Sequence, residues 1–482
     1  MLIKNLLKGV DIAQLSDVNL LEKDVENISL NSKEIKENSV FVAIKGAIFD
    51  PHIIAEEIYA SGRVVCFISE KPLKNVPFIH VKGIKLALAT MCKNFFEIDP
   101  SALVKVAVTG TNGKTTTTYL LESIFSILGG VIKIGTINYS ICGEISEALN
   151  TTPGIYETFR MMSEGVKKGA KYLVMEASSH AIDQDRIAGI EFDLSIFTNL
   201  SGDHLDYHKS MEKYYLAKKK LFQKGKTKKA VINTTYSYGK RLYNEITIPK
   251  LACSVNDAAD VTSKAVNYSL DGTRVKIVSD SSEIEVNSSL VGQHNLENII
   301  CAVSAAKFLG IEDETTKRGI EKIKSVPGRL EKIESDGKYF FVDYAHTDDA
   351  LKNVLQAVTP YKKNRIITLF GCGGDRDRTK RPRMAKVAEE YSDLVIVTSD
   401  NPRTEDPESI ILEICEGFSN KSKIVTITDR GEAIQQAVKI AQRGDIVILA
   451  GKGHEDYQVV GRQKTHFDDR EEVKKALFGV MA

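Results

Sequence analysis

The residues best suited to chemistry lie in the stretch TGTNGKTT, residues 109–116. Gly110, Gly113, Lys114 and Thr115 follow an apolar run, VKVAV, and precede a helix-like segment. Glycines in such a loop let backbone N–H groups converge on a phosphate, and the helix presents its positive end to it. Lys114 would reach the outer phosphates, and Thr115 would offer its hydroxyl to Mg²⁺. An ordinary glycine turn is the alternative, but the position between strand and helix favours nucleotide binding.

Further metal ligands are expected where apolar runs end, because Mg²⁺ prefers oxygen ligands and ligands gather at strand ends. Glu176 ends the run KYLVM, and Asp203, His204, Asp206 and His208 follow the run LSIFTNL. The spacing of the two histidines would place them on one helical face, so a zinc pair is conceivable. No third ligand cluster is evident, which disfavours zinc. We interpret His208 as structural.

A third candidate site is the stretch TSDNPRTEDP, residues 398–407. Asp406 and Pro407 have the pattern of a helix start, with Asp406 as N-cap and proline at the first helical position. That pattern leaves the segment DNPR, residues 400–403, unexplained. It follows the apolar run LVIV, at the expected carboxyl end of a strand, where doubly wound sheets bind ligands.

The elements that must position these residues indicate an α/β protein of three domains. At 482 residues the chain is too long for one core. Residues 1–98 predict a small domain, residues 99–328 a central P-loop domain with a parallel sheet, and residues 329–482 a Rossmann-like doubly wound domain. Period-two alternation from Asp260 to Leu290 predicts an antiparallel hairpin inserted in the central domain.

Composition excludes several classes of partner. The 65 Lys and Arg residues nearly balance the 64 Asp and Glu residues, which gives no reason to expect nucleic-acid binding. The seven cysteines contain no CxxC pair, as expected for reduced thiols in the cytoplasm. No apolar run approaches the roughly 18 residues of a membrane-spanning helix. We expect a cytoplasmic monomer without membrane insertion.

The motifs taken together resemble those of the Mur ligase family, over nearly the whole chain. GTNGKTT, NTTP, MEASSHAIDQDR, TNLSGDHLDYH, PGRLE, VDYAHT, GCGGDRD, DNPR and GKGHE occur in the family's order. The resemblance implies ATP-dependent addition of meso-2,6-diaminopimelate to UDP-N-acetylmuramoyl-L-alanyl-D-glutamate, through an acyl phosphate, in peptidoglycan precursor synthesis. It implies three substrates: ATP, the UDP-linked dipeptide and a diamino acid.

The resemblance also assigns roles around ATP. Catalytic roles fall to Lys114, Glu176, His204, Lys218 and Arg329, and Mg²⁺ would be held by Thr115, Glu176, His204 and a modified Lys218. The modification is a carbamate made from CO₂, which turns a cation into a carboxylate beside the metal. Read plainly, Lys218 is one of three consecutive lysines on a solvated helix. The expected ATP contacts are Gly110, Thr111, Asn112, Gly113, Lys114, Thr115, Thr116, Asn295, Arg329 and Asp343.

The other two substrates have their own implied contacts. Those to the UDP-linked dipeptide are Leu30, Ser32, Ala47, Ile48, Phe49, Asn150, Thr151, Thr152, Ser178, Gln184 and Arg186. Those to diaminopimelate are Arg376, Asp400, Asn401, Pro402, Arg403, Gly451 and Glu455. Arg403 would grip the distal carboxylate, since arginine matches carboxylate geometry, while Asp400 and Asn401 would read the ammonium. The sequence departs from the family pattern at Lys33, Pro51, Asp348 and His294.

Three alternatives stay open at this point. Folylpolyglutamate synthesis would share the ATP loop, although the leading domain and the DNPR segment argue against it. A nucleotide-regulated switch protein would leave the acidic and arginine positions of the last domain unexplained. The same ligation with L-lysine or an analogue such as meso-lanthionine is the third, because Arg403 cannot distinguish a methylene from sulfur.

Overall fold

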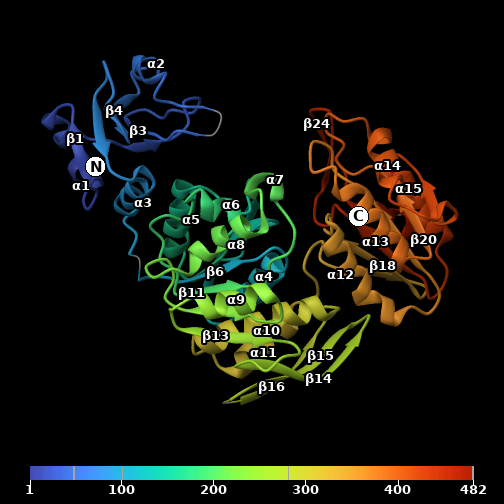
Figure 1. The fold of residues 1–482 in the computed structure, drawn as a ribbon. Helices are drawn as coiled ribbons and strands as arrows, with labels where there is room; N and C mark the ends of the chain where they lie inside the picture. The colour runs from blue at the N-terminus through green and yellow to red at the C-terminus, as the bar shows by residue number, and fades with distance from the viewer. Residues whose placement is uncertain (47–48, 100, 281, 480–482) are drawn as a thin grey trace. The chain divides into compact units, whose positions relative to one another are not determined.

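A computed structural model of the chain describes residues 1–46, 49–99, 101–280 and 282–479. The N-terminal part, blue in Figure 1, is a five-stranded sheet of order β1-β5-β4-β3-β2, in which only β1 runs antiparallel to its neighbour. Its buried apolar runs, such as VVCFIS, explain the strands. Its elements are α1 (Ile3–Leu6), β1 (Ile12–Leu15), η1 (Val18–Glu22), β2 (Asn27–Ser29), β3 (Ser39–Ala43), α2 (Ala55–Ala60), β4 (Val64–Ser69), β5 (Phe78–Val81) and α3 (Ile84–Phe95).

An eleven-stranded sheet follows, with the order β16-β15-β14-β13-β12-β11-β6-β10-β7-β8-β9. Its strands are β6 (Val104–Thr109), β7 (Gly130–Ile134), β8 (Asn138–Ile141), β9 (Glu144–Glu147), β10 (Ala170–Glu176), β11 (Leu194–Phe197), β12 (Ala230–Asn233), β13 (Lys250–Ser254), β14 (Val261–Ser269), β15 (Gly272–Ser279) and β16 (Ser282–Ser288). The region predicted as a hairpin holds three antiparallel strands, β14 to β16, because β16 pairs with β15 from Ser279↔Ser282 to Thr273↔Ser288.

The helices of this region follow the alternation that the sequence predicted. They are α4 (Lys114–Phe125), α5 (Ile155–Lys167), α6 (Ser179–Asp183), α7 (Leu205–His208), α8 (Met211–Lys219), η2 (Lys220–Phe222), α9 (Ser237–Glu245), α10 (Gln293–Phe308) and α11 (Asp313–Lys322). Helix α10 is buried on nearly all sides, from Asn295 to Ala306, which its sequence NLENIICAVSAA permits.

The last region is a doubly wound sheet of order β17-β18-β22-β19-β20-β21, parallel except for β17 (orange and red in Figure 1). Helices α12 to α14 pack on one face and α15 and α16 on the other. The elements are β17 (Glu331–Ser335), β18 (Lys338–Asp343), α12 (Asp348–Val358), η3 (Thr359–Tyr361), β19 (Ile366–Phe370), α13 (Lys380–Tyr391), β20 (Leu394–Val397), α14 (Pro407–Cys415), η4 (Lys421–Lys423), β21 (Ile424–Thr426), α15 (Arg430–Ile440), β22 (Ile446–Ala450), β23 (Tyr457–Val460), β24 (Gln463–His466) and α16 (Asp469–Phe478).

The chain packs into two compact units. Each unit combines three separate stretches of the sequence, whereas each of the three predicted domains is one continuous stretch. The first unit comprises Met1–Ala107, Gly129–Ser195 and Lys220–Lys228, and the second comprises Val108–Leu128, Ile196–Lys219 and Lys229–Ala482. The phosphate loop and the DNPR segment therefore belong to the second unit. The domain boundaries near residues 98 and 328 stay predictions.

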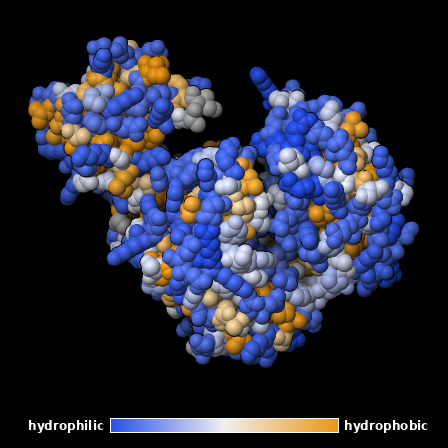
Figure 2. Space-filling model, in the orientation of Figure 1, coloured by the Kyte–Doolittle hydropathy of each residue, from blue (hydrophilic) through white to orange (hydrophobic). Residues whose placement is uncertain are grey.

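The face shown in Figure 2 is mainly hydrophilic. On the face shown in Figure 2, apolar residues occur in small separate groups and do not form a continuous band. None of the helices within the described ranges has the length and apolar content needed to cross a bilayer.

Candidate active site

The phosphate loop is shaped by two glycines that leave no room for a side chain. A Cβ atom on Gly110 would lie 1.9 Å from Oγ1 of Thr198, and one on Gly113 would lie 2.1 Å from Oδ1 of Asn298. Gly113 also has a φ of +85°, a conformation that favours glycine. The loop joins β6 to α4 as predicted, so the N-terminus of a twelve-residue helix faces it.

Lys114 begins helix α4 and folds back over the loop. Its Nζ donates to the carbonyl oxygens of Gly110 at 2.9 Å and Thr111 at 2.7 Å. The hydroxyl of Thr115 accepts a hydrogen bond of 3.3 Å from Nη2 of Arg329, which lies 214 residues further along the chain. Lys114, Thr115 and Arg329, all predicted to contact ATP, therefore lie together in the structure. The first two belong to the loop and the start of α4, and Arg329 lies just before β17.

Lys218 lies within this cluster and is 1% exposed, whereas the prediction from its lysine-rich context alone was a solvated side chain. Its Nζ donates to the carbonyl of Gly110 at 2.9 Å and lies 4.7 Å from the centre of the Tyr214 ring. The neighbouring Lys219 is 30% exposed and forms an ion pair of 2.8 Å with Glu245. Helix α8 therefore places two adjacent lysines in opposite environments.

The charges around Lys218 favour its neutral amine. Burial, and then the positive charge of Lys114, hold the pKa of Lys218 well below its usual value, and Asp203 only partly opposes them. Burial alone would raise the pKa of Asp203, but the charges of His204, His346 and Lys114 lower it. An unprotonated amine is the nucleophile that CO₂ requires.

His204 and His208 differ in burial, although the rings of both lie beside Tyr214, that of His204 with its centroid 6.3 Å away. His204 precedes helix α7 in a left-handed conformation, with φ of +53°, and its side chain is 46% exposed beside Asp203. His208 is buried, and its ring stacks on Tyr214 with centroids 4.9 Å apart.

Asp343 and Asn295 hold the backbone near the nucleotide loop. Asp343 ends β18 and accepts hydrogen bonds from the N–H groups of Leu330 at 2.7 Å and Ala345 at 2.8 Å. Burial raises its pKa to about 6. Asn295 is buried in the first turn of α10 and donates to the carbonyl of Val291 at 2.9 Å. Among the remaining predicted ATP contacts, Thr116 is buried within α4, and the N–H of Asn112 donates to Asn199.

Glu176 ends β10 as predicted and is fully buried in the first unit. One carboxylate oxygen accepts from the N–H of Thr136 and the other from its hydroxyl, each at 2.9 Å. The hydroxyl of Thr136 also lies 3.1 Å from that of Thr151. A Cβ on Gly135 would lie 2.5 Å from the Glu176 carboxylate. Sequence reasoning did not identify Thr136, whose only signal is its position after strand β7.

Five of the predicted contacts to the UDP-linked dipeptide form one network around Glu176, namely Thr151, Thr152, Ser178, Gln184 and Arg186. The Thr152 hydroxyl donates to the carbonyl of Glu176 at 2.7 Å, and Ser178, the N-cap of α6, donates its N–H to Thr152. Arg186 donates to the carbonyl of Thr152 at 3.2 Å and to Oε1 of Gln184 at 2.9 and 3.1 Å. Asn150 pairs through its backbone with the hydroxyl of Tyr139.

The predicted uridine contacts follow parallel strands of the N-terminal sheet. Leu30 follows β2 and is 37% exposed, Ser32 is half-buried nearby, and Phe49 lies beyond β3 and is 50% exposed. Ala47 and Ile48 lie outside the described residues. The carboxyl ends of parallel strands are where such sheets bind ligands.

The DNPR segment follows β20, and its arginine is held by two neighbouring elements. Arg403 has a φ of +52°, its N–H donates to the carbonyl of Val459, and its Nη1 donates to the carbonyl of Gly374 at 2.8 Å. A Cβ on Gly374 would lie 1.9 Å from the carbonyl oxygen of Pro402, and one on Gly371 would lie 2.3 Å from that of Thr398, which explains two of the glycines of GCGGD. Asp406 caps α14 by accepting from the N–H of Ser409, which confirms the predicted helix start.

Two carboxylates near Arg403, those of Asp400 and Glu455, form ion pairs with Lys452, a residue that sequence reasoning did not identify. Lys452 is fully buried, with its Nζ 3.7 Å from Asp400 and 3.4 Å from Glu455. Asn401 donates to Glu455 at 2.8 Å and accepts from Lys452 at 3.3 Å. Burial and the nearby Asp400 raise the pKa of Glu455. The signal for Lys452 was its place within GKGHE.

Three further predicted contacts lie around this cluster. Pro402 is buried between Asn401 and Arg403, and the side chain of Arg376 is exposed. Gly451 has a φ of +114°, and a Cβ there would lie 3.1 Å from the Asp400 carboxylate. One carboxylate oxygen of Asp400 is buried without a hydrogen-bond partner, so it is a candidate acceptor for a ligand ammonium.

Across the described ranges, no three His, Cys, Asp or Glu side chains are grouped so as to hold a metal ion by themselves. The predicted donors for Mg²⁺ are instead of mixed type: a hydroxyl, a carboxylate, an imidazole and a carbamate. Oxygen donors dominate that set, and oxygen is what Mg²⁺ prefers, with substrate phosphates commonly completing its shell.

Comparison with known proteins identifies the family. Residues 108–306 match the Mur ligase middle domain, and residues 328–453 match the Mur ligase glutamate ligase domain. A UDP-N-acetylmuramoyl-L-alanyl-D-glutamate--2,6-diaminopimelate ligase from Fusobacterium nucleatum is 41% identical over 480 residues, 98% of each chain.

Solved structures agree with this assignment. One of a UDP-N-acetylmuramoyl-L-alanyl-D-glutamate--2,6-diaminopimelate ligase is 33% identical and covers 99% of each chain, with a TM-score of 0.73. A folylpolyglutamate synthase from Mycobacterium tuberculosis, complexed with ADP and AMPPCP, has a TM-score of 0.63 at 16% identity, over 76% of this chain and 92% of that one, a likeness of fold alone. The predicted resemblance is confirmed, and the chain belongs to the Mur ligase family.

Proposed function

We propose that the protein is an ATP-dependent ligase that adds 2,6-diaminopimelate to UDP-N-acetylmuramoyl-L-alanyl-D-glutamate in peptidoglycan precursor synthesis. The observation that carries this function is the 41% identity to a ligase of that name, over 98% of both chains. The structure offers one candidate region for each substrate: the phosphate loop for ATP, the network around Glu176 for the UDP-linked dipeptide, and the cluster around Arg403 for diaminopimelate.

The chemistry follows from the groups to be joined. A carboxylate of the dipeptide attacks the γ-phosphate of ATP, so ADP leaves and an acyl phosphate forms. The amine of diaminopimelate then attacks the acyl carbon, inorganic phosphate leaves, and the amine gives up a proton. Lys114 and Arg329 would stabilise the negative charge on the transferring phosphoryl group, because both cationic groups converge on Thr115 and the loop carbonyls.

Mg²⁺ would be held by Thr115, Glu176, His204 and a carbamate on Lys218, where it would neutralise phosphate charge. The environment of Lys218 supports the carbamate: a buried amine with a lowered pKa beside Lys114. Its nitrogen attacks CO₂, a new N–C bond forms, and one proton is released. The resulting anion would relieve the repulsion between Lys218 and Lys114.

The amino-acid region is suited to a zwitterion. Arg403 offers a cation, and Asp400 and Glu455 together outweigh the single charge of Lys452. The distal end of diaminopimelate carries both a carboxylate and an ammonium, so it would satisfy Arg403 and the acidic pair at once. Lysine lacks that carboxylate and would leave Arg403 unmatched. Asn401, Pro402, Arg376 and Gly451 would shape this region.

The first unit would hold the UDP-linked dipeptide. Leu30, Ser32 and the segment 47–49 would contact uridine, and Asn150 with the network of Thr151, Thr152, Ser178, Gln184 and Arg186 would contact the rest. The domain at residues 1–98 would then hold uridine, the domain at 99–328 would hold ATP and the rest of the UDP-linked dipeptide, and the domain at 329–482 would hold diaminopimelate. We also propose a monomer in the cytoplasm, where the seven free thiols stay reduced.

An omission assay tests the function. Phosphate release should require ATP, the UDP-linked dipeptide and diaminopimelate together, with one tripeptide formed for each phosphate. Release with ATP alone would indicate a nucleotide switch instead. Parallel assays with meso-diaminopimelate, meso-lanthionine and L-lysine should rank lysine far below the other two, and a preference for lysine would contradict the assignment to Arg403.

A further inference from the structure

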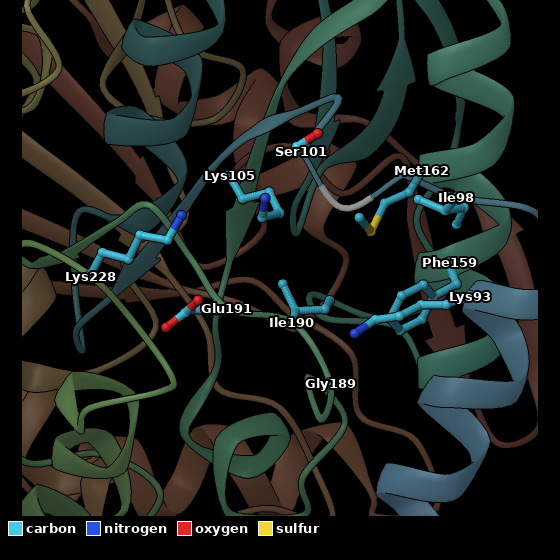
Figure 3. A pocket seen from close by; sticks show the side chains of 10 residues that line it. All are labelled: Lys93, Ile98, Ser101, Lys105, Phe159, Met162, Gly189, Ile190, Glu191 and Lys228. Atoms are coloured by element: carbon cyan, nitrogen blue, oxygen red, sulfur yellow. The ribbon is translucent and has the colours of Figure 1, made fainter. Parts of the chain in front are cut away.

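A cavity within the first unit lies away from the predicted substrate contacts. It has a volume of about 300 Å³ and is lined by residues of α3, α5 and β6, of the segment after α6, and of the connections that precede β6 and β12 (Figure 3). That volume is at the lower end of the range for small-ligand sites. None of its lining residues is among those predicted for ATP, the dipeptide or the amino acid.

Three lysines line the cavity from different elements. In Figure 3, Lys93 and Lys228 extend from opposite sides, with Lys105 between them and higher in the view. Lys105 is 8% exposed and its Nζ lies 3.4 Å from Asp193, the same carboxylate that pairs with Lys228 at 2.8 Å. One carboxylate is therefore shared by two ammonium groups.

Lys93 has no comparable partner. Within the described ranges no hydrogen-bond acceptor or carboxylate lies in contact with its ammonium, and it sits in the last turn of α3. Burial, and then the charge of Lys105, lower its pKa. Lys105 is buried and shares the Asp193 carboxylate with Lys228, and Lys93 adds a further positive charge, so an anion in the cavity would stabilise the arrangement.

The remaining walls are largely apolar. Phe159 and Met162 of helix α5 are 1% and 3% exposed, and Ile190 is 4% exposed. Figure 3 shows the side chains of Phe159 and Met162 on the side opposite Lys228. Glu191 is the one acidic residue among the described lining residues, at the Lys228 side. A ligand here would meet Lys93 together with the apolar side chains at one side, and Lys228 and Glu191 at the other.

We propose that this cavity is a binding site for a small organic anion, with its acidic group among Lys93, Lys105 and Lys228 and its apolar body against Phe159, Met162 and Ile190. The site is independent of the ligase reaction. It selects for both features of the ligand, since inorganic phosphate would lack the apolar contact and a neutral aromatic molecule would lack the charge.

Isothermal titration with 1-naphthoate tests the proposal, using the full chain with a non-hydrolysable ATP analogue present to occupy the phosphate loop. Saturable binding of one naphthoate is expected, with a Kd of about 1 mM or tighter. The neutral isostere 1-naphthamide and inorganic phosphate should each bind at least about tenfold more weakly. Absence of saturable naphthoate binding, or equal binding of the amide, would overturn the site.

Variants locate the binding. Lys93→Gln combined with Lys228→Gln should weaken naphthoate binding by about tenfold or more, because two of the three cations are removed. Lys167→Gln, an exposed lysine on the same helix as Phe159, is the matched control and should bind normally. Unchanged affinity in the double variant would refute the proposal.

Salt dependence and ligase activity complete the test. Affinity of the unmodified chain for naphthoate should fall as salt rises, although less steeply than for exposed charges, and salt-independent binding would contradict a cationic site. In the absence of naphthoate, the double variant and the unmodified enzyme should release phosphate at the same rate. This result separates the cavity from the ligase function, because either one can fail while the other holds.

Discussion

Two lysines, Lys218 near the phosphate loop and Lys452 near Arg403, are equally buried and differently surrounded. Lys218 donates to one carbonyl oxygen and forms no ion pair with any described carboxylate. Lys452 lies within 4 Å of both Asp400 and Glu455. Burial without a counter-charge favours a neutral, reactive amine, whereas burial between two carboxylates favours a fixed cation. The contrast indicates a chemical role for Lys218 and a structural role for Lys452.

Lys218→Ala tests the chemical side of this contrast and has the largest expected effect. Without the carbamate, the phosphate-release rate should fall by roughly a thousandfold, the cost of a lost charge in a preorganised site. Added formate or acetate should restore part of it. Lys219→Ala is the matched control, since that exposed neighbour pairs with Glu245 and should keep its activity. Full activity of Lys218→Ala would remove the carbamate from the mechanism.

Lys452→Met tests the structural side. Removing the cation leaves Asp400 and Glu455 buried together, and the free energy of unfolding in urea should fall by about 3–5 kcal/mol at pH 7.5. The deficit should shrink toward pH 5, because the pKa of Glu455 is raised by burial and its protonated carboxyl group needs no counter-ion. Lys439→Met, at an exposed position on α15, should change stability little. If both variants unfold alike, Lys452 is not the counter-ion.

Arg403→Ala tests whether Arg403, next to the charged cluster of Asp400, Lys452 and Glu455, binds a substrate. We expect kcat/KM for diaminopimelate to fall by about a hundredfold, since a charge-assisted bond to the distal carboxylate is lost. The KM for ATP should stay within about twofold. Arg378→Ala is the control, because that exposed arginine pairs with Glu413 in the same region. Equal losses for both substrates would point to misfolding.

His294→Phe should give the smallest effect, a change in the pH dependence of stability. It tests whether a buried histidine without a counter-charge is held neutral, as we infer for Lys218. Burial lowers the pKa of His294 to about 4, so the folded chain holds it neutral while the unfolded chain protonates it near pH 6.5. The folded state therefore loses stability as the pH falls from about 6.5 toward 4. The variant should lack that loss, which is about 2 kcal/mol at pH 5, measured by urea unfolding. An identical pH profile for both proteins would show that His294 is readily protonated.

The sequence predicted those features that depend on local pattern. Gly110 to Thr115 lie between a strand and a helix, Glu176 ends a strand, and Asp406 caps a helix, all as expected. The three-stranded extension β14 to β16 was underestimated, because a polar stretch leaves a weak signal. The burial of Lys218 and Lys452 depends on residues over 50 positions away, including Gly110 and Asn401, so no local pattern could reveal it.

The left-handed backbone of Arg403 has an evolutionary consequence. A non-glycine side chain at a φ of +52° costs on the order of 1 kcal/mol, which glycine would avoid and asparagine would reduce. Replacing the arginine by glycine or asparagine would thus relax the loop and at the same time remove the cation that we propose binds the distal carboxylate. A lineage can therefore lose the specificity for an amino acid with a distal carboxylate and gain stability in the same step. Regaining the specificity would cost the free energy of the left-handed conformation at position 403. Selection for the correct amino acid must therefore act continuously to keep arginine at this position.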